Sequence, residues 1–280
     1  MNIALGKVKS MNNLIGLFPA AGRGSRLGNI PCSKEIMPLG FQFSGNKKLS
    51  EEIWHPVTAI EAHLAAFRSA GVQQVGIVIG PTKWDIMRYL SNGEDFGLPI
   101  AYFYQEHLRG MPYALDLAFS WVQDSAILFS MPDTLITPDD AMAKLVAHHR
   151  LNKADVTLGL FPTDNPHKFG MVELDSEGDI VNFVDKPEYT NLEMMWGCAV
   201  WSAKFTHFMH KFLSELSITG TEIVLSDVFL AALKQGLSFT AFPIKNGKYH
   251  DIGTPESFQT AVYQLALQQM TDDIAGNSSR

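Results

Sequence analysis

Cysteine is scarce in this sequence, which has only two in 280 residues. Cys32 and Cys198 lie far apart without a CxxC spacing, so the sequence indicates neither a disulfide framework nor a zinc site. The nine histidines show no HExxH or other zinc spacing either. This pattern fits a reducing compartment, and we expect a cytoplasmic protein.

Long basic runs and long apolar runs are also lacking. The net charge is −7, and no cluster of lysine and arginine resembles those that follow a nucleic-acid backbone. The apolar runs fall far below the roughly 20 residues that a membrane-spanning helix requires. We therefore expect a protein that binds neither nucleic acid nor a membrane. Any lysine or arginine side chains that bind a ligand must act within a single site and not as a broad basic surface.

The remaining pattern predicts an α/β fold in a single domain over residues 14–270. Short apolar strands at 14–18, 75–79 and 126–129 alternate with amphipathic helices such as 57–70. This alternation is typical of a mixed, mainly parallel sheet flanked by helices. Such sheets bind ligands at the carboxyl ends of their strands.

The pattern changes in the second half of the domain. Residues 14–152 contain the alternating strands and helices, whereas residues 153–270 include two strands and a turn over 169–184 that predict a β-hairpin. The second half is therefore expected to form a smaller β-rich lobe. We expect residues 1–13 to be a disordered extension and residues 271–280 a flexible tail.

The residues after the first strand have the composition of a phosphate-binding loop. Gly22 and Gly24 let the backbone turn tightly and bring its N–H groups close to an anion. Lys34 is a further cation that a folded-back loop brings to the same phosphates. The candidate loop consists of Ala20, Ala21, Gly22, Arg23, Gly24, Ser25 and Arg26.

Two familiar phosphate motifs do not fit this loop. The dinucleotide fingerprint GxGxxG requires glycine where the chain has Leu27, and the GxxxxGK[ST] pattern is absent. An ordinary glycine-containing turn is the alternative interpretation. The added Ser-Arg and the later Lys-Glu favour a phosphate loop of another scheme.

GRGSRL at residues 22–27, followed by SKEIMPL at 33–39, resembles the signature of the sugar-1-phosphate nucleotidyltransferases. The family pattern is GxGTRL, a short gap, then PK and an apolar-Pro-apolar tail, so Ser25 replaces threonine and Ser33 replaces proline. The motif texture is nearest to the glucose-1-phosphate uridylyltransferases and thymidylyltransferases. The resemblance implies a Rossmann-like sheet in which residues 14–152 bind the nucleotide and residues 153–270, with the β-rich lobe, bind the sugar phosphate.

Two further segments of the first half resemble the family. Gln105 and Gly110 match a Q-x-x-P-x-G motif, which implies that the glutamine pairs with the pyrimidine edge and the glycine lines the base pocket. Asp133 follows a strand and matches the aspartate of the family's G-D pair, a ligand of Mg²⁺. A helix N-cap is the alternative role for Asp133, but Thr137 fits that role better.

The second half contains the remaining matches. Asp185 and Lys186 resemble the family's E-K-P, whose lysine contacts the sugar phosphate, and Gly170 resembles the glycine of a family turn before it. Glu222 implies a contact with sugar hydroxyls, although the first turn of a helix capped by Thr221 is an equally plain interpretation. The match of YHDIGTPE at 249–256 to W-x-D-[IVT]-G-T-P-E is nearly complete.

That last motif implies a second metal ligand, Asp251, followed by a helix over 255–268 with Thr254 at its N-cap. Together the matches imply a Mg²⁺-dependent transfer of a nucleotidyl group from a nucleoside triphosphate, UTP or dTTP favoured, to a sugar-1-phosphate, glucose-1-phosphate favoured. The catalytic residues would be Arg26, Lys34, Asp133 and Lys186. Family members commonly form dimers or tetramers, so a homodimer or homotetramer is expected.

The sequence leaves other functions open. A nucleotidyltransferase for a non-sugar phosphate such as phosphocholine would need an aromatic cage, which Trp196 and Trp201 could supply. A catalytically silent protein that binds nucleotide sugars is the alternative outside enzymes. A glycosyltransferase of related fold would normally carry a D-x-D motif, and Asp133-Thr-Leu lacks it.

Overall fold

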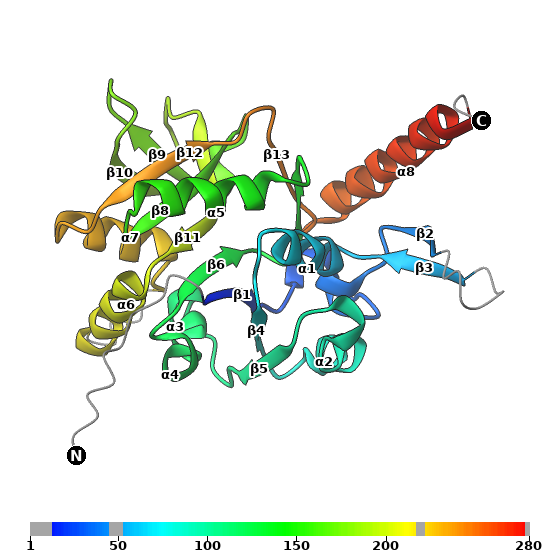
Figure 1. Cartoon of the computed structure of the whole chain (residues 1–280), viewed down its shortest axis with the longest axis horizontal. Helices are drawn as coiled ribbons and strands as arrows, with labels where there is room; N and C mark the ends of the chain where they lie inside the picture. Colours follow the sequence, from blue (N-terminus) through cyan, green and yellow to red (C-terminus); the bar gives the residue numbers. More distant parts are fainter. Residues whose placement is uncertain (1–12, 45–52, 217–221, 278–280) are drawn as a thin grey trace, which may run out of the picture.

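A single mixed sheet lies at the centre of the molecule (Figure 1). The computed structural model describes residues 13–44, 53–216 and 222–277, and within them nine strands form this sheet. Their order is β10-β9-β11-β6-β1-β4-β5, and β8 pairs with β11 on one side and with β12 on the other. The strands are β1 (Leu14–Ala20), β4 (Gln74–Ile79), β5 (Ile100–Tyr104), β6 (Ala126–Ser130), β8 (Val156–Pro162), β9 (Gly170–Leu174), β10 (Ile180–Asp185), β11 (Met194–Trp201) and β12 (Phe239–Pro243).

The first half of the chain forms the parallel part of the sheet, as predicted. Strand β1 is parallel to both β4 and β6, and β4 is parallel to β5, so their carboxyl ends lie at one edge. β1 is buried along nearly its whole length, which accounts for its apolar composition. The sheet therefore presents its loops where a ligand site is expected.

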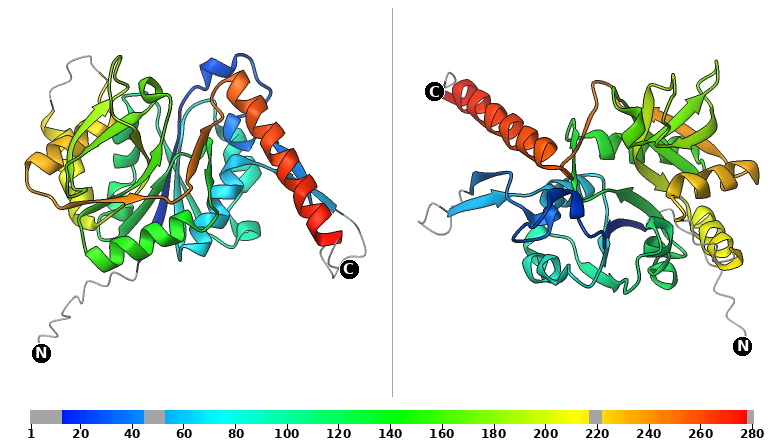
Figure 2. Two further views of the ribbon diagram at one scale, coloured as in Figure 1. Left: turned by 90° about the horizontal axis from the view of Figure 1, so that it is seen from above. Right: turned by 180° about the vertical axis from the view of Figure 1, so that it is seen from behind.

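Helices cover both faces of the sheet (Figure 2). Buried side chains of α1, α2 and α5 belong to the core on one face, and those of α3, α4, α6 and α7 to the core on the other. Residues 111–122 form two short helices, α3 and α4. The helices are α1 (Ala59–Ser69), α2 (Trp84–Leu90), α3 (Met111–Asp116), α4 (Phe119–Val122), α5 (Ala141–Asn152), α6 (Ala203–Glu215), α7 (Leu225–Lys234) and α8 (Pro255–Asn277).

The strands of the second half join the same sheet. β11 runs antiparallel to β6 and to β8, and β9 pairs with β10 as the predicted antiparallel hairpin. The β-rich second half is thus an extension of the central sheet and not a separate one. This continuity fixes the hairpin relative to the carboxyl ends of the parallel strands.

Two small antiparallel pairs were not predicted. β2 (Gly40–Ser44) pairs with β3 (Ile53–Val57), and β7 (Thr134–Thr137) pairs with β13 (Lys248–Asp251). The prediction that Thr137 caps a helix is wrong, because Thr137 ends β7 and α5 begins only at Ala141.

The last helix begins as the sequence predicts but is longer. Thr254 occupies the N-cap, where its hydroxyl oxygen accepts a hydrogen bond from the Ser257 amide at 3.2 Å. Helix α8 continues to Asn277, beyond the predicted end at residue 268. α8 and the β2–β3 hairpin extend together from one side of the sheet (Figures 1 and 2), joined by packing of Leu265 near Gly40.

The two ends of the chain fall outside the part that the structure describes. They are residues 1–12 of the extension expected at 1–13, and residues 278–280. Among the residues that the structure describes, no helix is both long enough and apolar enough to cross a membrane.

Candidate active site

The candidate phosphate loop follows β1, the central parallel strand. Ala20 and Ala21 are buried at its start, whereas the side chains of Arg23, Ser25 and Arg26 are exposed. Gly24 has φ +66°, a left-handed conformation that favours glycine, and it leads into the 3-10 turn Ser25–Leu27. The loop is therefore an exposed turn that carries two guanidinium groups at the edge where the parallel strands end, which is where such sheets generally bind ligands.

Lys34 and Asp133 form an ion pair in this site. The Lys34 ammonium group donates a hydrogen bond to Asp133 Oδ2, and only 12% and 9% of the two side chains are exposed. Burial acts to lower the pKa of Lys34, but the carboxylates of Asp133 and Glu35 outweigh it and raise the pKa above the usual value. Lys34 is therefore a fully charged cation at neutral pH.

Asp251 reaches the same place through the pairing of β13 with β7. In this pairing Asp251 lies opposite Thr134, and the Ile252 amide donates to the Asp133 carbonyl oxygen at 3.1 Å. Arg26 Nη2 lies 3.5 Å from Asp251 Oδ2, so this carboxylate also has a cationic partner. The structure brings Arg26, Lys34, Asp133 and Asp251 into one cluster.

The close contact of Arg26 with Asp251 depends on the glycine that follows. A Cβ atom on Gly253 would lie 2.6 Å from Arg26 Nη2 and 2.8 Å from Asp251 Oδ1. The Gly253 amide also donates to Asp251 Oδ1 at 2.8 Å, which fixes the rotamer of that carboxylate. Gly253, the glycine of the motif at 249–256, is thus required because a larger residue would crowd Arg26 and Asp251.

The two aspartates are suited to Mg²⁺ that is shared with a substrate. No group of three or more His, Cys, Asp or Glu residues that could hold a metal occurs within the described part of the chain. Mg²⁺ commonly takes one or two carboxylates and completes its coordination with phosphate oxygens and water. Two carboxylates on adjoining backbone segments, beside a phosphate loop, fit that mode of binding.

A cavity of about 200 Å³ adjoins the phosphate loop and contains the candidate base-binding residues. Gln105 is buried directly after β5, and its backbone is fixed by a hydrogen bond to the Ile79 carbonyl oxygen at 2.9 Å. The structure brings these residues together although they come from four segments. The lining is Pro19, Ala21, Gly22, Gln105, Leu108, Gly110, Met111, Ala114, Met131 and Glu222.

Gly110 and Glu222 are in contact range in this cavity. Gly110 has φ +98°, and a Cβ atom there would lie 2.5 Å from the Ile223 carbonyl oxygen and 3.2 Å from Glu222 Cγ. Glu222 does not lie in the first turn of a helix, because α7 begins at Leu225 and Asp227 accepts the amide hydrogen of Val224. Thr221, predicted as the cap, lies outside the described residues.

Gly170, Asp185 and Lys186 form a second group on the β9–β10 hairpin. Gly170 pairs with Asp185, and a Cβ atom on it would lie 2.4 Å from Trp196 Nε1, so only glycine leaves room there. Lys186 adopts φ +44°, and its ammonium group, on a side chain that is 58% exposed, lies 3.5 Å from Asp185 Oδ2. Among the described residues, no hydrogen bond or ion pair joins this group to the Asp133–Asp251 cluster.

The structure also contains a buried ion pair and a buried histidine to which the sequence motifs assign no role. Glu35 and Lys83 form an ion pair at 2.7 Å with 2% and 4% of their side chains exposed. No local pattern predicts this pair, since Glu35 lies in a 3-10 turn and Lys83 lies 48 residues later at the N-cap of α2. His63 could have been found, because it lies at a core position of the apolar stripe Ile60, Leu64 and Phe67 on α1.

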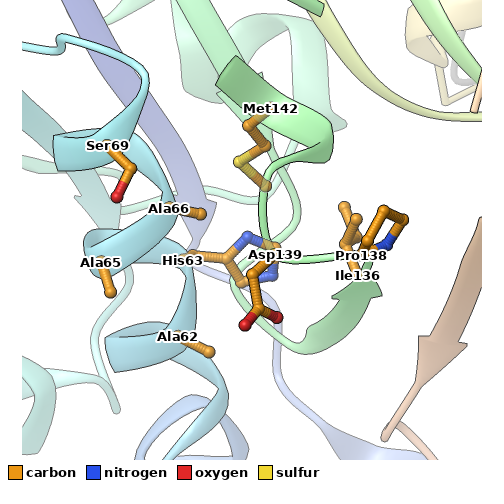
Figure 3. A pocket seen from close by; sticks show the side chains of 9 residues that line it. All are labelled: Ala62, His63, Ala65, Ala66, Ser69, Ile136, Pro138, Asp139 and Met142. Carbon is orange, nitrogen blue, oxygen red and sulfur yellow. The ribbon is translucent and has the colours of Figure 1, made fainter. Parts of the chain in front are cut away.

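His63 contacts residues on both sides of Asp133 in the sequence. Its Nδ1 lies 3.0 Å from Ser130 Oγ and its Nε2 lies 2.8 Å from the Thr134 carbonyl oxygen. Burial lowers the pKa of His63 to about 4, so the ring is neutral at physiological pH. It also borders, with Asp139 and Met142, a cavity of about 310 Å³ between α1 and the segment leading into α5 (Figure 3).

Residues 16–268 match the family model described as nucleotidyl transferase. The chain belongs to the sugar-1-phosphate nucleotidyltransferase family. This confirms the resemblance inferred from the motifs, and it covers both halves of the domain. The roles that the resemblance implies for individual site residues remain predictions.

Two curated relatives illustrate the similarity. The low-salt glycan biosynthesis nucleotidyltransferase Agl11 of Haloferax volcanii is 25% identical over 258 residues, which are 90% of this chain and 66% of that protein. A glucose-1-phosphate thymidylyltransferase of Streptomyces antibioticus is 27% identical over 132 residues, or 47% of this chain and 36% of that protein. The chain thus spans between 36% and 66% of the length of these relatives.

A solved structure confirms the fold. A putative glucose-1-phosphate thymidylyltransferase of Bacillus anthracis, crystallised in complex with sucrose, superposes with a TM-score of 0.76 at 21% identity, covering 90% of this chain and 94% of that one. The predicted mixed, mainly parallel sheet with flanking helices is therefore the fold of this family.

Proposed function

We propose that this protein transfers a nucleotidyl group from a nucleoside triphosphate to a sugar-1-phosphate, releasing pyrophosphate. The observation that supports this most directly is the cluster of Arg26, Lys34, Asp133 and Asp251 beside the phosphate loop. Two cations and two carboxylates at the carboxyl ends of β1 and β6 match the needs of a triphosphate bound with Mg²⁺. Membership of the family supports the same reaction.

In this reaction an oxygen of the sugar phosphate attacks the α-phosphorus of the triphosphate. One P–O bond forms, the P–O bond to the leaving pyrophosphate breaks, and no covalent enzyme intermediate is required. The protein contributes positioning and charge neutralisation, as in phosphoryl transfer generally. Asp133 and Asp251 would hold Mg²⁺, which supplies charge neutralisation for the phosphates when bound.

The protein's own cationic side chains would neutralise the remaining negative charge of the phosphates. We expect Arg26 and the amides of the exposed loop to bind the β- and γ-phosphates, and Lys34 to bind the phosphate at the reacting centre. Because Lys34 and Arg26 already pair with the two aspartates, the site is close to neutral before substrate arrives. Lys34 and Arg26 would then exchange their contacts with the aspartates for contacts with the phosphates of the triphosphate.

The cavity beside the loop is suited to the base and to part of the sugar. The Gln105 carboxamide offers a donor and an acceptor, which the edge of uracil or thymine requires, so UTP or dTTP is the favoured donor. Glucose-1-phosphate is the favoured acceptor, in keeping with the name of the Streptomyces relative. Glu222 would accept from sugar hydroxyls, and Lys186, with Gly170 and Asp185, would bind the sugar phosphate.

The phosphocholine alternative loses its structural basis. Trp201 is fully buried and donates to Thr206 Oγ1, while Trp196 donates to Ser226 Oγ at 3.1 Å. These two indoles therefore do not form an open aromatic cage for a quaternary ammonium group. Measurement of pyrophosphate release decides the silent-binder alternative.

The deciding experiment measures pyrophosphate release with Mg²⁺ across UTP, dTTP, ATP, GTP and CTP, each paired with several sugar-1-phosphates. We expect release only when both substrates are present, highest with glucose-1-phosphate and UTP or dTTP, and none after chelation of Mg²⁺. Reactions lacking either substrate are the controls. Absence of release for every pair, with nucleotide binding still detected by thermal shift, would replace this proposal with the silent-binder alternative.

A further inference from the structure

Side chains at the start of α2 bond the two residues that flank Lys34. The Ser33 amide and the Ser33 hydroxyl donate to Asp85 Oδ2 and Oδ1, each at 2.6 Å. Two residues further on, Lys83 donates to Glu35 Oε2 at 2.7 Å. Ser33 and Glu35 thus face α2, while Lys34 between them points to Asp133.

Burial of the Glu35–Lys83 ion pair is energetically unfavourable. The side chains of Glu35 and Lys83 are 2% and 4% exposed, so both charges have left water almost completely. A buried ion pair often contributes no more to stability than a packed apolar pair of the same volume. Stability alone therefore does not account for two charges here, whereas a directional contact next to Lys34 does.

The hydrogen bonds between Ser33 and Asp85 take the place of the restraint that a proline ring would impose. Ser33 stands where the family pattern has proline, and its backbone has φ −59° and ψ 135°. Proline fixes φ at about −65°, so Ser33 already adopts the conformation that a proline ring would enforce. Serine has no ring, and its conformation is held by the paired hydrogen bonds from its amide and hydroxyl to Asp85.

We propose that Asp85 and Lys83 are positioning residues for Lys34. They hold Ser33 and Glu35 so that the Lys34 ammonium group meets Asp133 and, if the proposed function holds, the phosphates of the substrate. Asp85 and Lys83 act through these neighbours and not through a hydrogen bond of their own to Asp133. Asp85 provides through hydrogen bonds the restraint that proline provides in the family pattern.

The first test follows Lys34 itself and needs no substrate. Lysine acetylation by an amine-reactive ester is timed by mass spectrometry, with exposed Lys144 as the internal reference. We expect Asp85→Ala to raise the labelling rate of Lys34 about tenfold, because its shielded contact with Asp133 opens more often. Asp95→Ala, at an exposed aspartate near the same helix, should leave the rate unchanged.

The second test asks whether proline can replace Asp85. Adding Ser33→Pro to Asp85→Ala should return Lys34 labelling close to the wild-type rate, since the ring restores φ at residue 33. Asp85→Asn, which keeps one acceptor oxygen, should lie between wild type and Asp85→Ala. Unchanged labelling in Asp85→Ala would overturn the proposal, and so would a rise that Ser33→Pro fails to reverse.

Activity provides a separate readout. Pyrophosphate release by Asp85→Ala should fall about tenfold in kcat/KM and recover with Ser33→Pro, in parallel with the labelling. If the wild-type protein releases no pyrophosphate from any pair of substrates, the proposed function fails while the labelling still decides the role of Asp85. Loss of activity with normal Lys34 labelling would count against positioning of Lys34.

Discussion

Lys34 and Asp133 form a shielded ion pair although they are 99 residues apart in sequence. The contact joins the segment after the phosphate loop to the loop after β6. Arg26 makes the corresponding contact with Asp251. Each candidate metal ligand therefore has its own cation, and the site keeps its charges balanced without a substrate.

The two aspartates should be essential for turnover. Replacing Asp133 or Asp251 with asparagine removes the charge that would hold Mg²⁺ but keeps the size of the side chain. We expect kcat for pyrophosphate release to fall by about 100-fold or more for each. Steady-state kinetics with Mg²⁺ in excess provides the measurement.

Asp140→Asn is the matched control for this pair. Asp140 is an exposed aspartate that bonds Lys144 at the start of α5, and its loss should leave kcat within a factor of two. Circular dichroism should show the same fold for all three variants. Near-normal turnover in Asp133→Asn or Asp251→Asn would refute the metal assignment.

Gly110 should be required for nucleotide binding. In Gly110→Ala the new methyl group would approach the Ile223 carbonyl oxygen to 2.5 Å and push the Glu222 segment away from the cavity. We expect KM for the nucleoside triphosphate to rise about tenfold or more, measured by varying it at saturating sugar phosphate.

The control for Gly110→Ala separates crowding from backbone strain. Gly178 has φ +89°, but no atom lies within 4 Å of the position that an added methyl group would take, so Gly178→Ala suffers only the strain of a left-handed residue. Both variants should lose about 1 kcal/mol of stability or more. An equal change in KM for both would show that the Gly110 contact is irrelevant to the nucleotide.

Most of the fold could be predicted because its elements are encoded locally. The strand Met194–Trp201 and the helix α1 follow from apolar runs and helical spacing. The β7–β13 pair could not be found this way, since each strand has four residues and its partner lies more than a hundred residues away. Short strands of that kind form only because tertiary contacts support them.

The candidate site also contains residues that the sequence reveals and one that it does not. Its glycines, cations and aspartates follow each other in family order, so the motif resemblance predicted Arg26, Lys34, Asp133 and Asp251 together. The role of Asp85 was invisible, because one aspartate at the start of a helix is ordinary in any sequence. Only its distance of 2.6 Å from both donors of Ser33 singles it out.

Breaking the Glu35–Lys83 pair should destabilise the protein far more than replacing both of its members. Lys83→Met leaves the Glu35 carboxylate buried without its cation, and we expect about 3–5 kcal/mol of destabilisation. Glu35→Met together with Lys83→Met removes both charges and should recover most of that loss. Urea unfolding at pH 7 measures both, and a double variant no more stable than Lys83→Met would contradict this account.

Acid should destabilise the protein through two buried histidines. Burial lowers the pKa of His63 and of His149 to about 4, against 6.5 for the unfolded chain. Between pH 6.5 and 4 the unfolded chain therefore binds protons that the folded protein does not, so the free energy of unfolding falls as pH falls through this window. Each histidine contributes a slope of up to about 1.4 kcal/mol per pH unit.

Urea unfolding from pH 7.5 to about 4.5 tests this dependence. His63→Gln can keep hydrogen bonds to Ser130 and Thr134 but cannot titrate, so its stability should fall less steeply with acid than that of the wild type. His167→Gln, at an exposed histidine, is the control for the substitution itself. If His63→Gln and the wild type lose stability in parallel, His63 binds its proton as readily in the folded protein as in the unfolded chain, and its neutral role beside Asp133 is wrong.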